Sequence, residues 1–215
     1  METAGAATLA IGALIAVAAS AWVVAGPAAA GLATMVVGAA GGLWVSVQGR
    51  RAIASLGARE LREGEEPRLV NLVRGIAADI SLAPPLIFVF DSGGPNALVC
   101  RARGPAVVVA RSLLESYTRT ELEAVVAHCL LRLAHDGWLA AAVAVGLGPL
   151  GRRIGPRRGT ADDVRAACLT RYPPALSSAI AKAELRQDAF SPFWFAAAGP
   201  WHRAGEPRRK TLSEL

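Results

Sequence analysis

The distribution of charge along the chain constrains its fold more than any other feature. Across residues 1–48 the only charged side chain is Glu2, whereas all 23 lysines and arginines lie beyond residue 48. Because a charge in hydrocarbon is costly, a run of about 20 uncharged apolar residues is typical of a membrane span. The uncharged stretch is about twice that length, and Gly26-Pro27 near its middle breaks a helix. It therefore predicts two transmembrane helices, residues 6–25 and 28–47, joined in a hairpin.

Two other interpretations compete with this prediction. A cleaved signal peptide needs a basic amino-terminal region, and the first residues offer only an acid. A buried apolar hairpin in a soluble protein would also lack charge, since Ala and Gly make both segments only moderately hydrophobic. Trp22 and Trp44 near the segment ends favour the spans, because amphipathic rings prefer the membrane interface.

Basic residues predict the orientation of the hairpin. Arg50, Arg51, Arg59 and Arg62 follow the second segment, while the turn and the amino terminus contain no Lys or Arg. The positive-inside rule then places a multi-pass protein in the cell membrane with its domain on the cytoplasmic side. Beyond residue 48 there are 23 basic and 16 acidic residues (17 less Glu2), a net charge of +7. Anionic headgroups attract such a domain, so the lipid bilayer is an expected partner.

Other partner and compartment classes are disfavoured. The arginines are scattered and no basic motif interleaved with aromatic residues occurs, so nucleic acid is not an expected partner. Cys100, Cys129 and Cys168 are too few for a disulfide framework and form no C-x-x-C pair. A reducing cytosol fits this cysteine content.

The rest of the chain divides into a juxtamembrane linker (49–66), a domain (67–195) and a basic tail (196–215), with the chain expected to be loose from Ser191. Apolar runs between proline and glycine predict three strands. These strands cover residues 86–90, 97–100 and 106–110. Helices are predicted between and after them, which makes the fold class α+β: a transmembrane hairpin followed by a mostly helical domain with a small sheet.

The predicted helices follow from periodicity, prolines and caps. One helix begins at Pro67 and continues to Ile80, and a later one begins at Pro173. Two more are predicted from capping boxes, Thr120 with Glu123 and Thr160 with Asp163. Residues 137–150 are apolar but short of a span, which leaves a core helix or an interfacial segment.

Several strings in this domain, in this order and spacing, resemble a known family. They are PPLIFVF (84–90), PNA (95–97), VVVARSLL (107–114), ELEAVVAH (121–128), DVRAACLT (163–170) and PPAL (173–176). The chain resembles the HtpX-like membrane-anchored zinc metallopeptidases, which are related to the CAAX prenyl proteases. The resemblance covers about residues 68–195, suits two spans before the domain and implies a zincin-like fold.

The catalytic side chains of that family are largely replaced here. In the family an H-E-x-x-H helix supplies two zinc ligands and a general base, and a later helix supplies a third ligand, a Glu. This sequence has His128 at the first ligand position, Cys129 at the base, Arg132 at the second ligand and Gly159 at the third. The resemblance therefore implies loss of the zinc site, so no cofactor is expected.

Arg132 invites a specific hypothesis. A guanidinium has no lone pair to donate and repels a dication, so it could fill the vacated pocket and supply the positive charge that the metal once gave. The side chain should then point inward, toward His128 and Asp163. A zinc site rebuilt with His135 is disfavoured because His135 lies about 10 Å along the helix from His128. A nucleophilic Cys129 is disfavoured because a lone helical cysteine is usually a small buried hydrophobe.

Other polar candidates have structural explanations as well as functional ones. Asp162 and Asp163 would place negative charge at a helix amino terminus. Asn96 would form a turn. Following the family, Val107, Val108, Val109 and Ala110 would form an edge strand that, with Asn96 nearby, could still hold a peptide.

Three functions remain in competition. The first is a membrane-anchored, catalytically inactive metallopeptidase homologue that binds a membrane protein or peptide as a scaffold or regulator. The second is an active membrane zinc endopeptidase with atypical ligands, which would require zinc. The third is a protein that binds anionic membrane surfaces through its arginine excess.

Overall fold

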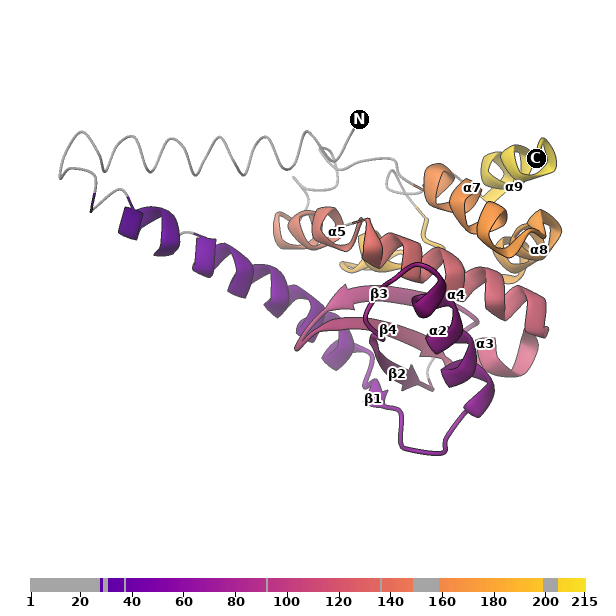
Figure 1. The fold of residues 1–215 in the computed structure, drawn as a ribbon, viewed down its shortest axis with the longest axis horizontal. Coiled ribbons are helices and arrows are strands. Elements are labelled where there is room, and N and C mark those ends of the chain that lie inside the picture. The colour runs from indigo at the N-terminus through magenta and orange to yellow at the C-terminus, as the bar shows by residue number, and fades with distance from the viewer. Residues whose placement is uncertain are drawn as a thin grey trace.

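A computed structural model describes residues 28, 31–36, 38–91, 93–135, 137–148, 159–198 and 205–215. The first predicted span, residues 6–25, lies outside them, as do residues 149–158. In the described part a small sheet is covered by helices, and one long helix projects from the domain (Figure 1).

The sheet has four strands in the order β1-β2-β4-β3. They are β1 (Arg59–Glu60), β2 (Leu86–Phe90), β3 (Ala97–Arg101) and β4 (Pro105–Ala110). β4 runs parallel to β2 and antiparallel to β3. Residues 106–110 are fully buried, as expected for a valine-rich run paired on both sides. The three predicted strands are confirmed, and β1 in the predicted linker is an addition.

The expectation that Val107, Val108, Val109 and Ala110 form an edge strand is wrong. Strand β4 lies between β2 and β3, so both of its backbone edges are already hydrogen-bonded. From β2 the chain first crosses to the outer position as β3 and then returns through a hairpin as β4. The order of strands along the sequence therefore differs from their order in the sheet, and β3 is the edge strand on that side.

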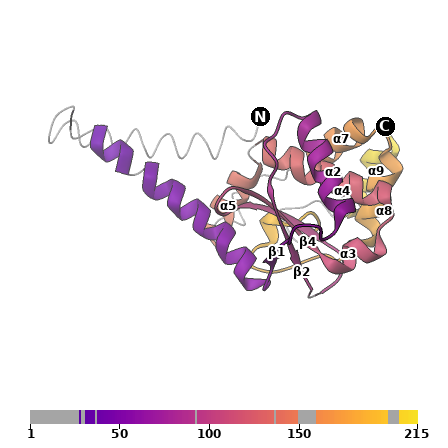
Figure 2. The same cartoon turned by 60° about the horizontal axis from the view of Figure 1, so that its bottom comes forward.

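The helices pack mainly around α4, which runs across the sheet (Figures 1 and 2). They are α2 (Pro67–Asp79), α3 (Arg111–Ser116), α4 (Arg119–Ala134), α5 (Gly137–Gly146), α7 (Gly159–Thr170), α8 (Pro173–Lys182), the 3-10 turn η1 (Ser191–Phe193) and α9 (Gly205–Ser213). Because α2, α7, α8 and the sheet surround α4, almost every residue from Leu122 to Leu133 is buried. The described part is therefore mostly helical with a small mixed sheet.

The capping box of α4 lies two residues before the predicted one. Thr118 Oγ1 accepts a hydrogen bond from the Glu121 amide (3.3 Å), and the Glu121 carboxylate accepts one from the Thr118 amide (2.8 Å). The sequence contains T-x-x-E twice, at 118–121 and at 120–123. Lys182 of α8 also donates to Glu121 (2.8 Å), which favours the earlier pair through a tertiary contact that a local pattern does not contain.

The long amino-terminal helix covers Gly31–Ser55. Among single helices in the described residues, it alone is long and apolar enough to cross a membrane. It contains most of the second predicted span and continues past residue 48, so the expected boundary with the linker is not a helix end. Helices α4 and α5 pass the same test only as a pair bent by 78°, and α4 is buried in the domain.

Two close contacts join this helix to the domain. A Cβ on Gly49 would lie 2.1 Å from the backbone oxygen of Arg101 at the end of β3. A Cβ on Gly146 of α5 would lie 2.1 Å from the ring of Trp44. Glycine is thus required at residue 49, where the neighbour is backbone, whereas a side chain at residue 146 would displace the Trp44 ring.

The expectation that the chain is loose from Ser191 onward is wrong for the described residues of that region. Phe193, Trp194 and Phe195 are fully buried, and residues 205–213 form α9. Burying three large aromatic side chains stabilises the domain enough to order a segment without regular periodicity. The predicted domain boundary at residue 195 consequently falls inside the packed region.

Candidate functional site

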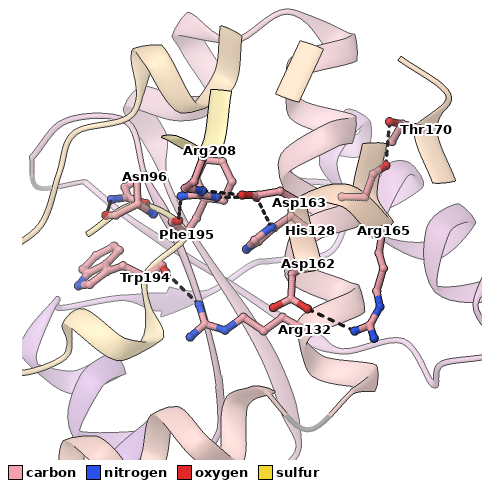
Figure 3. Close-up of polar contacts among 12 residues, drawn as sticks. Asn96, His128, Arg132, Asp162, Asp163, Arg165, Thr170, Trp194, Phe195 and Arg208 are labelled. Carbon is pink, nitrogen blue, oxygen red and sulfur yellow. Dashed lines mark hydrogen bonds and ion pairs between the residues drawn. The ribbon is translucent and has the colours of Figure 1, made fainter. Parts of the chain in front are cut away.

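The candidate site lies between α4 and α7, which pack side by side. His128 of α4 and Asp163 of α7 face each other in the core, with exposed fractions of 1% and 0% (Figure 3). Nδ1 of His128 lies 3.0 Å from Oδ1 of Asp163, an ion-pair distance, although no described group is aligned with Nδ1 as a hydrogen-bond partner. The His128 ring also packs edge-to-face on Phe195, with centroids 5.1 Å apart.

A second cation completes this cluster. Arg208 of α9 donates from Nε to Oδ2 of Asp163 (2.6 Å) and from Nη2 to Oδ1 (2.7 Å), a bidentate pair (Figure 3). Its Nη1 donates to the backbone oxygen of Phe195 (2.9 Å), and the guanidinium lies 5.1 Å from the Phe195 ring centroid. The predicted tail thus contributes a buried arginine to the site.

The electrostatics of Asp163 follow from these contacts. Burial alone raises the pKa of a carboxyl group. The hydrogen bonds from Arg208 and the contact with His128 outweigh burial and lower the pKa of Asp163 to about 2. Asp163 is therefore an anion that binds two side chains in the core, and not the first-turn capping residue that the T-x-x-D pattern predicts.

Arg132 points inward, as hypothesised, but its partners differ from the expected ones. Its side chain is only 9% exposed. Nη1 donates to the backbone oxygen of Trp194 (3.0 Å), and Nη2 donates to that of Pro192 (Figure 3). Gly137 leaves room for the side chain, because a Cβ there would lie 2.7 Å from Cγ of Arg132. The arginine that binds Asp163 is thus Arg208, and Arg132 binds the 192–194 backbone instead.

The two remaining family positions supply no usable ligand. Cys129 is 2% exposed, and burial raises the pKa of its thiol to about 12, so the thiol is not activated as a nucleophile. Gly159 is the first residue of α7 and has no side chain that could bind a metal. The interpretation of Cys129 as a small buried hydrophobe is consistent with this geometry.

The residues present do not fit a zinc ion. A catalytic zinc site needs three protein ligands and an open position for water. Of the family positions only His128 has a ligand side chain, and Arg132 brings a permanent cation into the same helix face. Among the described residues, no group of three His, Cys, Asp or Glu side chains could hold a metal ion.

The first residues of the β3 edge, next to this site, pair with a later segment of the chain itself. Phe195 donates its amide to the backbone oxygen of Ala97 (2.7 Å), and Trp194 forms an antiparallel bridge with Leu98. The fully buried amide of Asn96 spans the same junction. Its Nδ2 donates to the backbone oxygens of Glu184 and Ala196, both at 2.6 Å, and its Oδ1 accepts from the Ala97 amide (2.8 Å). Asn96 thus holds an internal segment, so its polar groups are not free for a bound peptide.

Sequence reasoning missed Arg208 and the segment 192–198. A weak signal existed for each. Arg208 and Leu212 are four residues apart, and both are buried on one face of an otherwise polar helix. The Phe-Trp-Phe run at 193–195 is too apolar for a solvated tail.

Comparisons with known proteins bear on the family. No family model matches the chain. It is 35% identical over 95 residues to a protease HtpX homolog of Thermodesulfovibrio yellowstonii, which covers 43% of this chain and 33% of that protein. It is also 34% identical to protease HtpX homologs of Acidiphilium cryptum (53% of this chain, 41% of the relative) and Halobacterium salinarum (39% and 29%).

The alignments cover less than half the length of each of these relatives. Their number and agreement nevertheless confirm the resemblance drawn from the sequence strings. Over the part that aligns, this chain is similar to the HtpX-like proteases.

Proposed function

We propose that this protein is a membrane-anchored, non-catalytic HtpX-like protein that acts by binding another protein. The observation on which this depends is the position of Arg132. Its guanidinium is buried at the second ligand position of the family and hydrogen-bonded to backbone oxygens of residues 192–194. A guanidinium remains charged at all physiological pH values, so it cannot act as a zinc ligand.

The rest of the domain supports a retained role other than catalysis. The His128–Asp163–Arg208 cluster, the four-stranded sheet and the packed α4 form a coherent core around the lost site. The Gly31–Ser55 helix supplies the anchor, and the arginines after it favour a cytoplasmic domain. Because residues 194 and 195 already pair with the first residues of β3, a partner would bind another surface. A membrane protein, such as an active protease of the same family, is the partner class that fits.

The second candidate is an active membrane zinc endopeptidase with atypical ligands. It is favoured by the names of the relatives, which are proteases, and by the presence of His128. Likeness of fold does not by itself establish chemistry, and only one of the family ligands is present.

Metal content and proteolysis separate the two functions. The full-length chain, purified in detergent after growth with zinc, should contain far less than one equivalent of zinc. It should also leave unfolded casein uncleaved, with or without a chelator. One equivalent of tightly bound zinc, or cleavage that is abolished by chelator and by His128→Ala, would establish the endopeptidase and refute the proposal.

A restored variant tests whether the geometry of the site survives. The triple variant Cys129→Glu, Arg132→His, Gly159→Glu should bind zinc if α4 and α7 keep their spacing. The same triple variant with His128→Ala provides the matched control and should lose that binding. Zinc binding that is equal in both would show that the metal sits elsewhere on the chain.

A further inference from the structure

Helix α5 presents apolar side chains beside the point where the amino-terminal helix leaves the domain. Both views show α5 on the side from which that helix projects (Figures 1 and 2). Leu139 and Leu147 are 39% and 43% exposed, and Gly146 packs directly on the ring of Trp44. Trp44 itself and Val47 are also exposed, so apolar side chains of the helix and of the α5 region lie on either side of the Gly146–Trp44 contact.

Exposed arginines form a rim around this apolar surface. Arg50 and Arg51 follow Gly49, which touches the backbone of Arg101. The Arg101 guanidinium lies 5.2 Å from the ring centroid of Trp138 in α5, and Arg103 is exposed in the adjoining hairpin. The four arginines therefore lie where three elements meet: the helix, the β3–β4 hairpin and α5.

No acidic residue offsets this charge within the contributing segments. Residues 43–58, 97–110 and 137–148 contain no Asp or Glu at all. The surface of a soluble domain usually carries interspersed positive and negative charges. An apolar patch with a purely cationic rim is instead typical of an interfacial membrane-binding helix.

The order of these groups along the helix matches the layers of a bilayer. Trp44, which contacts α5, precedes Gly49, which contacts Arg101, by five residues, or about 7.5 Å of helix rise. The apolar contact with α5 consequently lies nearer the hydrophobic part of the helix, and the arginines lie nearer the domain. Tryptophan at the boundary and arginine at the phosphate level is the expected arrangement.

We propose that α5 and this arginine rim form a membrane-contact face that binds anionic phospholipid headgroups. Leu139 and Leu147 enter the boundary between headgroups and acyl chains, and Arg50, Arg51, Arg101 and Arg103 bind lipid phosphates. The inference rests on the anchoring role of the Gly31–Ser55 helix in the proposed function. It does not depend on the loss of catalysis.

Spin labels test the depth of α5 in the full-length chain. In a Cys168→Ser background, which removes the one exposed cysteine, Leu139→Cys and Leu147→Cys are labelled and reconstituted in vesicles of phosphatidylcholine and phosphatidylglycerol. Both labels should be accessible to oxygen and shielded from an aqueous nickel chelate. Leu185→Cys is the matched control, because Leu185 is also exposed (53%) but lies far from the arginine rim. Its neighbour Glu184 donates its amide to the backbone oxygen of Pro95, just before the start of β3, whereas Arg101 is at the end of that strand. Its label should be open to the chelate.

The outcomes distinguish the membrane-contact face from the anchoring role of the Gly31–Ser55 helix. If the vesicles float in a density gradient without the protein, the helix is not an anchor, and the membrane-contact face is refuted with it. Flotation with labels 139 and 147 as open to the chelate as label 185 would overturn the face alone. Strong dipolar broadening between labels of neighbouring copies would show a protein interface at α5 and also overturn it.

The headgroup preference has its own measurement. Spin-labelled phosphatidylglycerol should show a larger immobilised fraction next to the wild-type chain than spin-labelled phosphatidylcholine. The double variant Arg101→Gln, Arg103→Gln should lose this preference, and Arg171→Gln, an exposed arginine after α7, should keep it. Equal immobilisation of both lipids by the wild type would overturn the anionic part of the proposal.

Discussion

At the scale of single residues, Arg208 has the largest consequence for the core. It satisfies both carboxylate oxygens of Asp163 and one backbone oxygen, while its own side chain is 2% exposed. Breaking a buried ion pair on one side leaves an uncompensated charge, which is far more costly than losing a surface pair. The position of this arginine near the chain end gives no hint of that role.

Arg208→Ala should therefore lower the free energy of unfolding by about 3–5 kcal/mol, the usual cost of a buried unpaired charge. Thermal unfolding in detergent, followed by circular dichroism, measures the effect. Arg209→Ala on the same helix is the matched control, because Arg209 is exposed and its loss should change stability by at most about 0.5 kcal/mol. Equal effects of the two variants would contradict the buried pair.

Asp163 should also make stability depend on acid. Its pKa in the folded chain is about 2, below the value of 3.8 of an unperturbed Asp. A lowered folded pKa means that the stabilisation is fully present above about pH 4 and is lost as the pH falls toward 2. Since one pKa unit corresponds to about 1.4 kcal/mol, the loss should amount to about 2 kcal/mol. The stability of Asp163→Asn should depend on acid less by about that amount. Identical acid dependence in the two proteins would exclude a titrating Asp163.

The candidate site could be predicted from sequence only in part. His128, Cys129 and Arg132 could be placed at family positions because all three lie in one continuous helix with a fixed periodicity. Arg208 could not, since it reaches Asp163 from 45 residues away along the chain. The partners of Arg132 were missed for the same reason: backbone oxygens of a distant segment carry no signature in the sequence.

At the scale of elements, local sequence patterns predicted where helices and strands begin and end better than they predicted which elements pack beside one another. Strand β2 and helix α2 match their predicted limits within one residue, because prolines and apolar periodicity define both. The edge position of β4 was taken from the family resemblance and was wrong. Hydrophobic patterning could not correct it, because it does not distinguish a central strand from a buried edge strand. Which T-x-x-E caps α4 depended on a contact with α8, which no local pattern contains.

The contact between the amino-terminal helix and β3 gives a prediction at this scale. Gly49→Ala should force the helix away from the Arg101 backbone and destabilise the domain by about 1–3 kcal/mol, as overpacking does. Gly42→Ala is the matched control, because nothing lies within 4 Å of a Cβ there. Thermal unfolding of both variants in detergent measures the difference, and a Gly49→Ala protein as stable as Gly42→Ala would refute the close packing.

At the scale of the whole molecule, the apolar Gly31–Ser55 helix and the basic domain after it suit two different environments. The helix exposes Leu32, Met35, Val36 and Leu43, whereas every Lys and Arg follows residue 48. Charge asymmetry of this kind orients a membrane protein through the basic flank of its span. The domain should accordingly lie on the cytoplasmic side.

A carboxy-terminal epitope tag should report that orientation. In spheroplasts of a bacterial host, added protease should leave the tag intact, and it should remove the tag only after lysis. Replacing Arg50 and Arg51 with Glu removes two of the basic residues that keep the domain on the cytoplasmic side. The fraction of tag cleaved before lysis should therefore increase. Complete cleavage of the wild-type tag in intact spheroplasts would place the domain outside and contradict the positive-inside assignment.

The two glycine contacts of the amino-terminal helix have a mechanical consequence. Gly49 against β3 and Trp44 against Gly146 hold the helix at two points about 7.5 Å apart along its axis, so the domain cannot swivel about its anchor. A change in bilayer thickness that tilts this helix must tilt the attached body by the same angle. The orientation of the domain relative to the membrane plane would therefore follow the tilt of this helix.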